Sequence, residues 1–430
     1  MKEVKVGLLG MGTVGTGVAR LIHSYVDDLK NKTGVTVKLA GILVKDLHKE
    51  RAFAVPRELL TENPYDLLDN PEIDCIIEVI GGIEPARTYI KRALQNRKHV
   101  ITANKDLMAE YGSELAAMAQ EYHCDLYYEA SVAGGIPIIK TITDGFSSDR
   151  IKKIMGIVNG TTNYILTKMT NEKMSYEQAL KEAMELGYAE SDPTNDVEGM
   201  DAARKMLILA TLGFHQPVQL GDVYYKGITD ITVEDLHYAQ QFGYTIKLLG
   251  IAKEDDGALE VSVQPTMLKN THPLAMVHGV NNAIYVYGNA VGETMFAGPG
   301  AGELPTATAV LSDLVTVVKN MKLGTNGKGT VVPYRERRLK REDEIFTKFF
   351  LRLIVVDKRG VLARIAKTCA DHDISLEQII QVPYPHVEQS AEFIVITHAT
   401  TVANLKTVLA ELKHADYVLE IKSCYRVEDE

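Results

Sequence analysis

A strand, a glycine-rich turn and the start of a helix open the chain, and this combination constrains its fold more than any other feature. Residues Lys5 to Leu9 are typical of an apolar strand, and Gly10-Met11-Gly12-Thr13-Val14-Gly15 then matches GxGxxG before a helix from about Val14 to Leu29. In this pattern the first glycine permits a tight turn, the second lets a pyrophosphate approach the backbone, and the third permits close helix packing. The amino end of the helix favours phosphate groups. We therefore expect a dinucleotide to bind at Gly10, Gly12, Thr13, Val14 and Gly15.

Short apolar runs then alternate with helical segments up to residue 128. The strand candidates are Thr36 to Val44, Cys75 to Ile80, His99 to Thr102 and Asp125 to Tyr128, and the helix candidates are Pro85 to Gln95 and Ser113 to His123. Such alternation predicts an α/β fold with a parallel sheet covered by helices on both faces. We assign residues 1–135 to a Rossmann-type domain, completed by a return helix at 307–320.

The pattern changes near residue 136 and again near residue 345. Longer helices at Ser175 to Leu186 and Met200 to Leu212, with strands at Ile151 to Val158 and Ala258 to Pro265, predict an α+β domain over 136–306. Residues 321–344 have the polar composition of a linker. The order of elements from 345 to 430 is βαββαβ, which predicts a ferredoxin-like module. Its strands are Phe349 to Val355, Ile374 to Gln381, Glu392 to His398 and Val418 to Cys424, and its helices are Val361 to Asp371 and Val402 to Leu412.

Composition excludes several classes of protein. The chain has 430 residues, 46% of them hydrophobic, which is enough for two or three ordered domains. A net charge of -10 argues against sequence-independent nucleic-acid binding. The chain has no apolar run long enough for a membrane span, and its first residues lack the order of a signal peptide, so we expect a cytoplasmic protein. The four cysteines are far apart and show no CxxC spacing, which predicts reduced structural thiols.

The end of the second strand bears on the choice of dinucleotide. Val44-Lys45-Asp46 stands where NAD-binding proteins usually have an acidic residue for the ribose hydroxyls. Lys45 suits a 2′-phosphate and favours NADP over NAD. Asp46 is close enough in sequence to bind a free 2′-hydroxyl instead, so both cofactors stay open.

An acidic loop followed by a helix provides candidates for proton transfer, which hydride transfer to a carbonyl requires. Asp201 and Lys205 are spaced i, i+4 and share one helical face. An isolated pair of this kind is usually a surface ion pair. However, Met206 to Ala210 are apolar nearly all round, which predicts a buried helix with Lys205 at a protected end. Burial favours the neutral amine and makes the lysine a candidate proton donor.

The chain resembles homoserine dehydrogenases over essentially its whole length. The resemblance rests on GLLGMGTVGTG, ITANKDLMA, YEASVAGGIPII, GIVNGTTNYIL, GYAESDPTNDVEGMDAARK and GPGAGELPTA, in this order. It implies reversible, NAD(P)-dependent reduction of L-aspartate 4-semialdehyde to L-homoserine, in the pathway to threonine and methionine.

The resemblance also implies roles for individual residues. Lys205 resembles the proton donor and acceptor, Asp201 the residue that orients it and contacts substrate, and Glu190 the carboxylate that receives the substrate ammonium. Lys105 resembles the catalytic lysine between nicotinamide and substrate, although a solvated loop lysine is the alternative. The remaining residues are Gly160 and Thr161 for substrate, and Lys45, Lys105, Gly187, Glu190 and Gly302 for the cofactor.

The turn EASVAGGIP resembles a family site for a monovalent cation, sodium by preference. Oxygens of Glu129, Val132, Gly134 and Ile136 would bind it, and backbone carbonyls suit such a hard ion. The alternative is that these glycines only form a tight turn between two domains.

The module at 345–430 resembles ACT domains, which bind amino acids where the first strand meets the first helix. Here that loop is Val356-Asp357-Lys358-Arg359-Gly360-Val361-Leu362. We expect threonine to bind there and inhibit, and the module to pair subunits of a homo-oligomer, dimer or tetramer. A purely structural dimerisation domain is the alternative.

Two other functions are alternatives to the dehydrogenase. An acylating semialdehyde dehydrogenase would need a nucleophilic cysteine, and Cys75 and Cys124 fall in or beside predicted strands of the cofactor domain. A non-enzymatic, NADP-dependent amino-acid sensor is the second alternative, and turnover that depends on Asp201 and Lys205 would exclude it. The chain has no room for the aspartokinase domain fused to some relatives, so ATP is not expected.

Overall fold

The structure is a computed structural model that describes residues 3–329 and 331–429. Contacts divide the chain into two compact units. Unit 1 comprises the chain up to Ile154 together with Arg204–Asp222 and Asn282–Arg337, and unit 2 comprises Met155–Ala203, Val223–Asn281 and the chain from Arg338 on. Residue 330, in the predicted linker, and both chain ends lie outside the described residues. The functional domain boundaries expected from the sequence stay a prediction.

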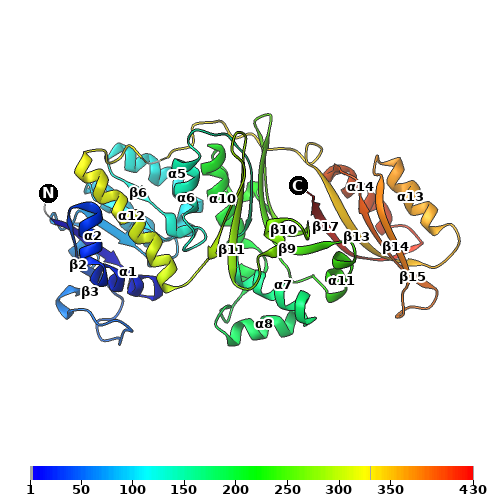
Figure 1. Cartoon of the computed structure of the whole chain (residues 1–430), viewed down its shortest axis with the longest axis horizontal. Helices are drawn as coiled ribbons and strands as arrows, with labels where there is room; N and C mark the ends of the chain where they lie inside the picture. Colours follow the sequence, from blue (N-terminus) through cyan, green and yellow to red (C-terminus); the bar gives the residue numbers. More distant parts are fainter. Residues whose placement is uncertain (1–2, 330, 430) are drawn as a thin grey trace. The chain divides into compact units, whose positions relative to one another are not determined.

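Unit 1 contains the parallel sheet that the sequence predicts. Its strand order is β3-β2-β1-β4-β5-β6, and every pairing is parallel. Apolar residues of β1, β2, α1 and α12 share one core, and α12 lies beside α1 in Figure 1. The elements are β1 (Glu3–Leu9), α1 (Thr13–Ser24), α2 (Val26–Thr33), β2 (Thr36–Leu43), β3 (Leu60–Thr61), α3 (Tyr65–Leu68), β4 (Cys75–Glu78), α4 (Ala86–Gln95), β5 (His99–Thr102), α5 (Lys105–Glu121), β6 (Leu126–Tyr127), α6 (Ile138–Lys140), β11 (Asn281–Gly288), β12 (Gly292–Pro299) and α12 (Glu303–Leu323).

Two helices of unit 1 differ from their predictions. The single helix expected from Val14 to Leu29 is divided into α1 and α2 at Tyr25, whose backbone is not helical. The helix expected from Ser113 begins earlier, at Lys105, because the side chain of Asn104 caps it by accepting a hydrogen bond from the backbone N–H of Leu107. Lys105 is therefore the first residue of a helix and does not lie in a loop.

Unit 2 contains most of the helices expected after residue 136 and the C-terminal module. Three elements, β7 (Ile151–Ile157), α10 (Met200–Phe214) and β11, contribute residues to both units. The others are α7 (Gly160–Glu172), α8 (Tyr176–Glu185), α9 (Thr194–Val197), β8 (Tyr224–Tyr225), α11 (Val233–Gln241), β9 (Tyr244–Asp255), β10 (Ala258–Lys269), β13 (Phe346–Val356), α13 (Val361–Asp371), β14 (Leu376–Pro383), β15 (Ser390–Thr397), β16 (Thr400–Thr401), α14 (Val402–Lys413) and β17 (Val418–Glu428).

The C-terminal module has the predicted ferredoxin-like arrangement, with strand order β17-β13-β15-β14. Its core joins α13 and α14 to one face of this sheet (Figure 1). The sheet does not end at the module, because β17 pairs in parallel with β10 through Thr266↔Arg426 and Leu268↔Glu428. The end of the predicted linker also joins β10, since Leu259 bonds to the backbone of Arg338 and Lys340.

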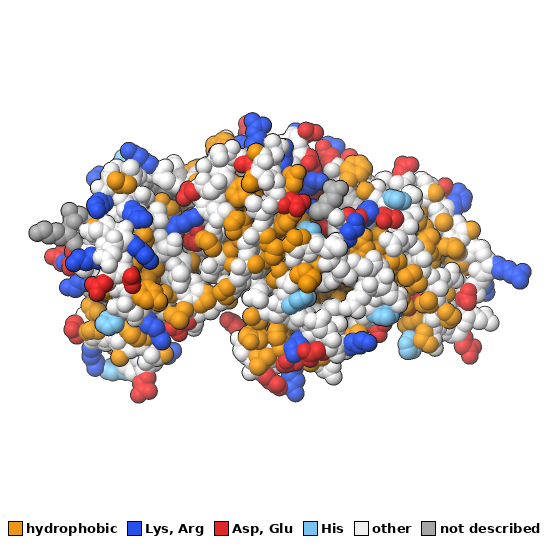
Figure 2. Space-filling model, in the orientation of Figure 1, with side chains coloured by type: hydrophobic (Ala, Val, Ile, Leu, Met, Phe, Trp, Pro, Cys, Tyr) orange, Lys and Arg blue, Asp and Glu red, His pale blue; other side chains and the backbone are white. Residues whose placement is uncertain are grey.

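Two further features concern the surface and the thiols. Among the described residues, no helix is both long and apolar enough to cross a membrane. Figure 2 shows acidic and basic side chains interspersed on the visible face of the molecule. Cys75, Cys124, Cys369 and Cys424 are free, and the first three are buried.

Candidate active site

The glycine turn between β1 and α1 has the geometry of a phosphate-binding loop. Gly10 has φ of 103°, and its N–H donates to the carbonyl of Leu43 on β2. A Cβ at Gly15 would lie 2.2 Å from the carbonyl oxygen of Gly10, so the helix can pack on the turn only without a side chain there. A Cβ at Gly12 would meet nothing within 4 Å, so contacts within the protein do not require this glycine. Thr13 and Val14 open the helix, and their N–H groups have no partner within it.

The predicted second cofactor contact, Gly302, lies near this helix. It precedes α12 with φ of 121°, a conformation that favours glycine. The next residue, Glu303, packs on Gly17 of α1, where a Cβ would come within 2.8 Å of the Glu303 carbonyl oxygen. Arg20 also contacts Glu303, at 3.3 Å. Tertiary packing therefore brings the start of α12 against α1, although 285 positions separate Gly17 from Gly302 in the sequence.

A buried carboxylate shapes the turns that follow β4 and β5. Glu78 accepts hydrogen bonds from the N–H groups of Ile80 and Gly81 and from the hydroxyl of Thr102. Burial raises the pKa of this carboxyl group, and the hydrogen bonds oppose the shift. Thr102 accepts from the N–H of Asn104, the residue that caps α5. This chain of contacts fixes the position from which Lys105 starts, and sequence reasoning did not select Glu78.

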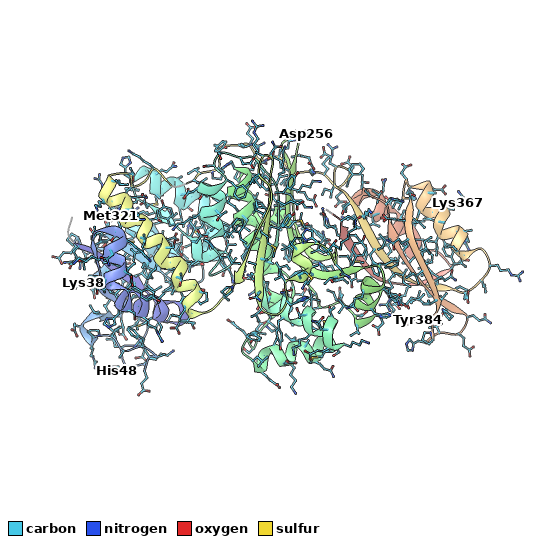
Figure 3. The ribbon with its side chains drawn as sticks, in the orientation of Figure 1. Lys38, His48, Asp256, Met321, Lys367 and Tyr384 are labelled. Carbon is cyan, nitrogen blue, oxygen red and sulfur yellow. The ribbon has the colours of Figure 1, made fainter. Side chains whose placement is uncertain are left out.

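The loop after β2 carries the residues expected to distinguish NADP from NAD. Lys45 and Asp46 are exposed, and Figure 3 shows His48 in the same loop. Asp46 Oδ1 accepts from the N–H of His48 at 2.7 Å, while the guanidinium of Arg51 donates to the carbonyls of Asp46 and Lys49. The carboxylate of Asp46 is thus used within the loop itself.

The predicted cation turn is tightly packed. Ala133 and Gly134 have φ of 56° and 50°, and a Cβ at Gly134 would lie 2.5 Å from the carbonyl oxygen of Gly300. The carboxylate of Glu129 accepts from the N–H groups of Ile139 and Lys140, both at 2.8 Å. The carbonyls of Glu129 and Ile136 each accept one backbone hydrogen bond and keep a second lone pair, while Val132 and Gly134 lie between them in the turn.

Burial also raises the pKa values of two carboxyl groups beside this turn. It raises the pKa of Glu129 to about 7, helped by the nearby carboxylate of Asp313. It raises the pKa of Asp313 to about 6, although Lys140 at 3.1 Å opposes the shift.

In unit 2, Asp201 of the expected site lies beside two further polar residues. Asn159 caps α7, and its side-chain amide donates to Asp196 at 2.7 Å and to Asp201 at 2.9 Å. Asp201 is 3% exposed. The hydroxyl of Thr161 donates to the carbonyl of Tyr188, which links α7 to the loop after α8. Asn159 and Asp196 were not selected from the sequence, although both lie in motifs that carry the family resemblance.

The other expected substrate residues lie in the same unit. A Cβ at Gly160 would lie 2.6 Å from the carbonyl oxygen of Val280, so the close approach of two backbones requires glycine. Gly187 has φ of 74°, and both it and Glu190 are exposed in the loop after α8. Lys205 lies four residues after Asp201, in the part of α10 that belongs to unit 1. It is half-buried, and the residues that follow it in the helix are buried.

The thiols do not fit an acylating mechanism. Burial raises the pKa of Cys124 to about 12 and that of Cys75 well above its usual value. Both therefore stay protonated at neutral pH, and the thiol is a poor nucleophile.

The expected effector loop connects β13 to α13. Gly360 precedes α13 with φ of 89°, which confirms the need for glycine at this turn. The N–H of Asp357 donates to the carbonyl of Gln389 and that of Val356 to the carbonyl of Tyr417, so the loop is fixed to both neighbouring segments.

Three family models match the chain in the order of its elements. Residues 10–129 match the NAD binding domain of homoserine dehydrogenase, residues 137–315 match homoserine dehydrogenase, and residues 349–414 match the ACT domain.

Similar proteins cover the whole length of the chain. A homoserine dehydrogenase of Bacillus subtilis is 54% identical over 428 residues, which is 100% of this chain and 99% of the relative. The crystal structure of a homoserine dehydrogenase from Thiobacillus denitrificans is 39% identical, with a TM-score of 0.94 over 100% of this chain and 99% of its own. A hyperthermophilic archaeal homoserine dehydrogenase in complex with NADPH is 26% identical, with a TM-score of 0.62 over 73% of this chain and 97% of its own. The chain belongs to the homoserine dehydrogenase family of NAD(P)-dependent oxidoreductases, and it carries an ACT domain.

Proposed function

We propose that the chain reduces L-aspartate 4-semialdehyde reversibly to L-homoserine, in the biosynthesis of threonine and methionine. The observation that carries this proposal is helix α10, where Asn159 holds the buried carboxylate of Asp201 and Lys205 follows four residues later. A carboxylate and an amine on one helical face suit proton transfer at a carbonyl oxygen. Family membership supplies the reaction class.

Each expected residue has a role in this reaction. Lys205 donates a proton to the substrate oxygen during reduction and accepts it during oxidation. Asp201 orients Lys205. The carboxylate of Glu190 accepts a charge-assisted hydrogen bond from the substrate ammonium. Gly160 and Thr161 line the carboxylate or reacting end of the substrate. Lys105 is at the positive amino end of α5 and would lie between the bound cofactor and the substrate.

The nicotinamide cofactor supplies or accepts the hydride when it is bound. Gly10, Gly12, Thr13, Val14 and Gly15 would hold its pyrophosphate, which fits the space left above Gly12. Lys105, Gly187, Glu190 and Gly302 complete its contacts.

We propose NADP as the preferred cofactor, because Lys45 is exposed at the end of β2 and the carboxylate of Asp46 is used within its own loop. Lys45→Ala should raise the KM for NADPH about tenfold and leave that for NADH unchanged, since only NADPH carries the 2′-phosphate. Lys49→Ala, in the same exposed loop, is the matched control. Equal effects of Lys45→Ala on both cofactors would contradict the preference.

A monovalent cation, sodium by preference, would bind at the turn from Glu129 to Ile136. Carbonyl oxygens of Glu129, Val132, Gly134 and Ile136 would hold it, because the carboxylate of Glu129 is bonded to α6.

Threonine would bind at the loop 356–362 and inhibit the enzyme, and the ACT domain would pair subunits of a dimer or tetramer. A cytoplasmic location would suit the four free thiols. Unchanged activity and melting temperature with threonine would exclude the sensing role.

The decisive experiment measures NADPH and NADH oxidation with aspartate semialdehyde, with and without threonine, for wild type and Lys205→Ala. We expect Lys205→Ala to lose at least about 100-fold in kcat while NADPH still binds, because general acid catalysis contributes on this scale. Lys181→Ala, at an exposed lysine of α8, is the control. No turnover by wild type would discard the dehydrogenase and favour an NADP-dependent amino-acid sensor.

A further inference from the structure

An ion pair joins the chain neighbours of the two lysines proposed for catalysis. Asp106 follows Lys105 in the first turn of α5, and Arg204 precedes Lys205 on α10. Arg204 Nη1 lies 3.2 Å from Asp106 Oδ1, and all four residues belong to unit 1. The pair therefore links the segment that carries one lysine to the segment that carries the other.

A cavity of about 540 Å³ is lined by side chains of both helices and by neighbouring loops. Its walls include Asp106, Met108, Gly112 and Ala116 of α5 and Arg204, Leu207, Ile208 and Thr211 of α10. Because empty space lies between the helices here, side-chain packing holds them less firmly than it would in a filled core. Asp106 and Arg204 bridge the gap at the end of α5 where Lys105 lies.

The contact is electrostatic in character. Within the part of the chain that the structure describes, Asp106 Oδ1 is buried but accepts no aligned hydrogen bond. The side chains of Asp106 and Arg204 are 34% and 26% exposed. Such a half-exposed pair adds little to folding stability, so its contribution is expected mainly in the relative position of the two helices.

We propose that Asp106 and Arg204 are positioning residues that set the separation of Lys105 from Lys205. This inference rests on the proposed function. Hydride and proton transfer require the reacting groups in one geometry, and a displacement of about 1 Å can cost 100-fold in rate. Asp106 also lies at the positive amino end of α5, where a carboxylate favours the helix start.

A double-mutant cycle on kcat tests the proposal in the full-length enzyme. Asp106→Asn and Arg204→Gln should each lower kcat about tenfold, and the double variant should lose about the same factor, because both changes break one contact. The KM for NADPH should stay unchanged. The deuterium isotope effect on kcat, with NADPH deuterated at the transferring position, should rise because the chemical step becomes slower. Asp106→Glu with Arg204→Lys, which keeps both charges, should recover part of the rate.

A second ion pair of unit 1 provides the control. Arg92 Nε of α4 lies 2.8 Å from Asp69 Oδ1 at the end of α3, so this pair joins neither α5 nor α10. Asp69→Asn and Arg92→Gln should leave kcat and the isotope effect unchanged. The proposal is overturned if the losses in kcat of the two single variants multiply in the double variant, or if kcat is unchanged. It is also overturned if the melting temperature falls with no change in the isotope effect.

Amine labelling separates failure of this inference from failure of the proposed function. If wild type shows no turnover, the labelling rates of Lys105 and Lys205, measured by mass spectrometry, still show whether the Asp106–Arg204 pair positions these lysines. Each single variant and the double variant should change both rates together, by about threefold or more. Unchanged labelling rates overturn the inference, whatever the activity.

Discussion

Gly10, Gly12 and Gly15 show how single residues of one motif differ in physical role. Gly10 is required by its positive φ, and Gly15 by the carbonyl that a Cβ would strike. Gly12 is required by neither, since the space beside it is open. The protein alone explains two of the three glycines, and a pyrophosphate bound as we propose would explain the third.

Alanine substitutions should separate these roles. Gly15→Ala should lower the free energy of unfolding by about 2 kcal/mol, because the Cβ forces the helix away from the turn. Gly12→Ala should leave stability within about 0.5 kcal/mol and weaken NADPH binding at least about tenfold. Urea unfolding and fluorescence titration with NADPH measure the two quantities. Normal cofactor binding by Gly12→Ala would contradict this account.

Lys247 on β9 is a buried lysine outside the proposed site. It is 2% exposed, and its ammonium donates to Asn163 Oδ1 at 3.0 Å and to the carbonyl of Val277 at 2.6 Å. Burial lowers its pKa to about 8. The unfolded chain therefore binds this proton more tightly than the folded chain does.

Because of Lys247, the free energy of unfolding should consequently rise with pH between about 8 and 10.5. The gain approaches about 3 kcal/mol, from a shift of two to three pH units at 1.4 kcal/mol per unit. Urea unfolding across this range should show a steeper rise for wild type than for Lys247→Met. Lys253→Met, on the outer part of the same strand, should behave like wild type. Parallel profiles for wild type and Lys247→Met would show that burial of Lys247 carries no such penalty.

At the scale of elements, a buried cluster of charges fastens α11 to the ACT sheet. Arg352 of β13 bonds to Asp235 of α11 and to Glu392 of β15. Asp235 also accepts from Ser423 and Tyr425 of β17. Every charge in the cluster therefore has partners, which makes its burial tolerable.

Removing the guanidinium of Arg352 should leave the carboxylates of Asp235 and Glu392 without their main partner. We expect Arg352→Met to lower the free energy of unfolding by about 3 to 5 kcal/mol. Arg364→Met, which breaks the exposed pair with Asp416, should cost less than about 1 kcal/mol. Urea denaturation of both variants gives the comparison. Equal losses of unfolding free energy in the two variants would mean that the buried cluster contributes no more to stability than an exposed ion pair.

At the scale of the whole molecule, the ACT domain is part of a larger sheet. Besides the pairing of β10 with β17, Arg426 lies buried between Glu260 of β10 and Glu428. The loop 356–362 at the end of β13, where we propose that the effector binds, is thus connected through one sheet to β9 and β10.

A chain that ends at residue 344 should accordingly be less stable than the full chain. It lacks β17, and Glu260 and Asp235 lose buried partners. We expect its melting temperature to fall by about 10 °C or more, since several kcal/mol are lost. Differential scanning calorimetry measures this, and an unchanged melting temperature would show that the two parts fold independently.

The sequence by itself determined the parallel sheet, the ferredoxin-like module and the family of the chain. Those features depend on local patterns: glycines at fixed spacing, apolar periodicity and motifs such as NGTTN. The starts of helices are harder to predict from such patterns. Helix α5 begins at Lys105 and not at Ser113, because capping by Asn104 outweighs the weak apolar pattern of the residues that follow it. The placements of Gly10 and Gly360 were also predictable, since a turn with positive φ favours glycine wherever it occurs.

Only the tertiary structure decided which distant residues meet. Asp235 contacts Tyr425, 190 positions away, and Arg204 contacts Asp106 across a cavity. The pairing of β17 with β10 belongs to the same group. Such contacts depend on how complete elements pack, because the partner of a buried charge is chosen by its neighbours in space and leaves no periodic signal in the chain.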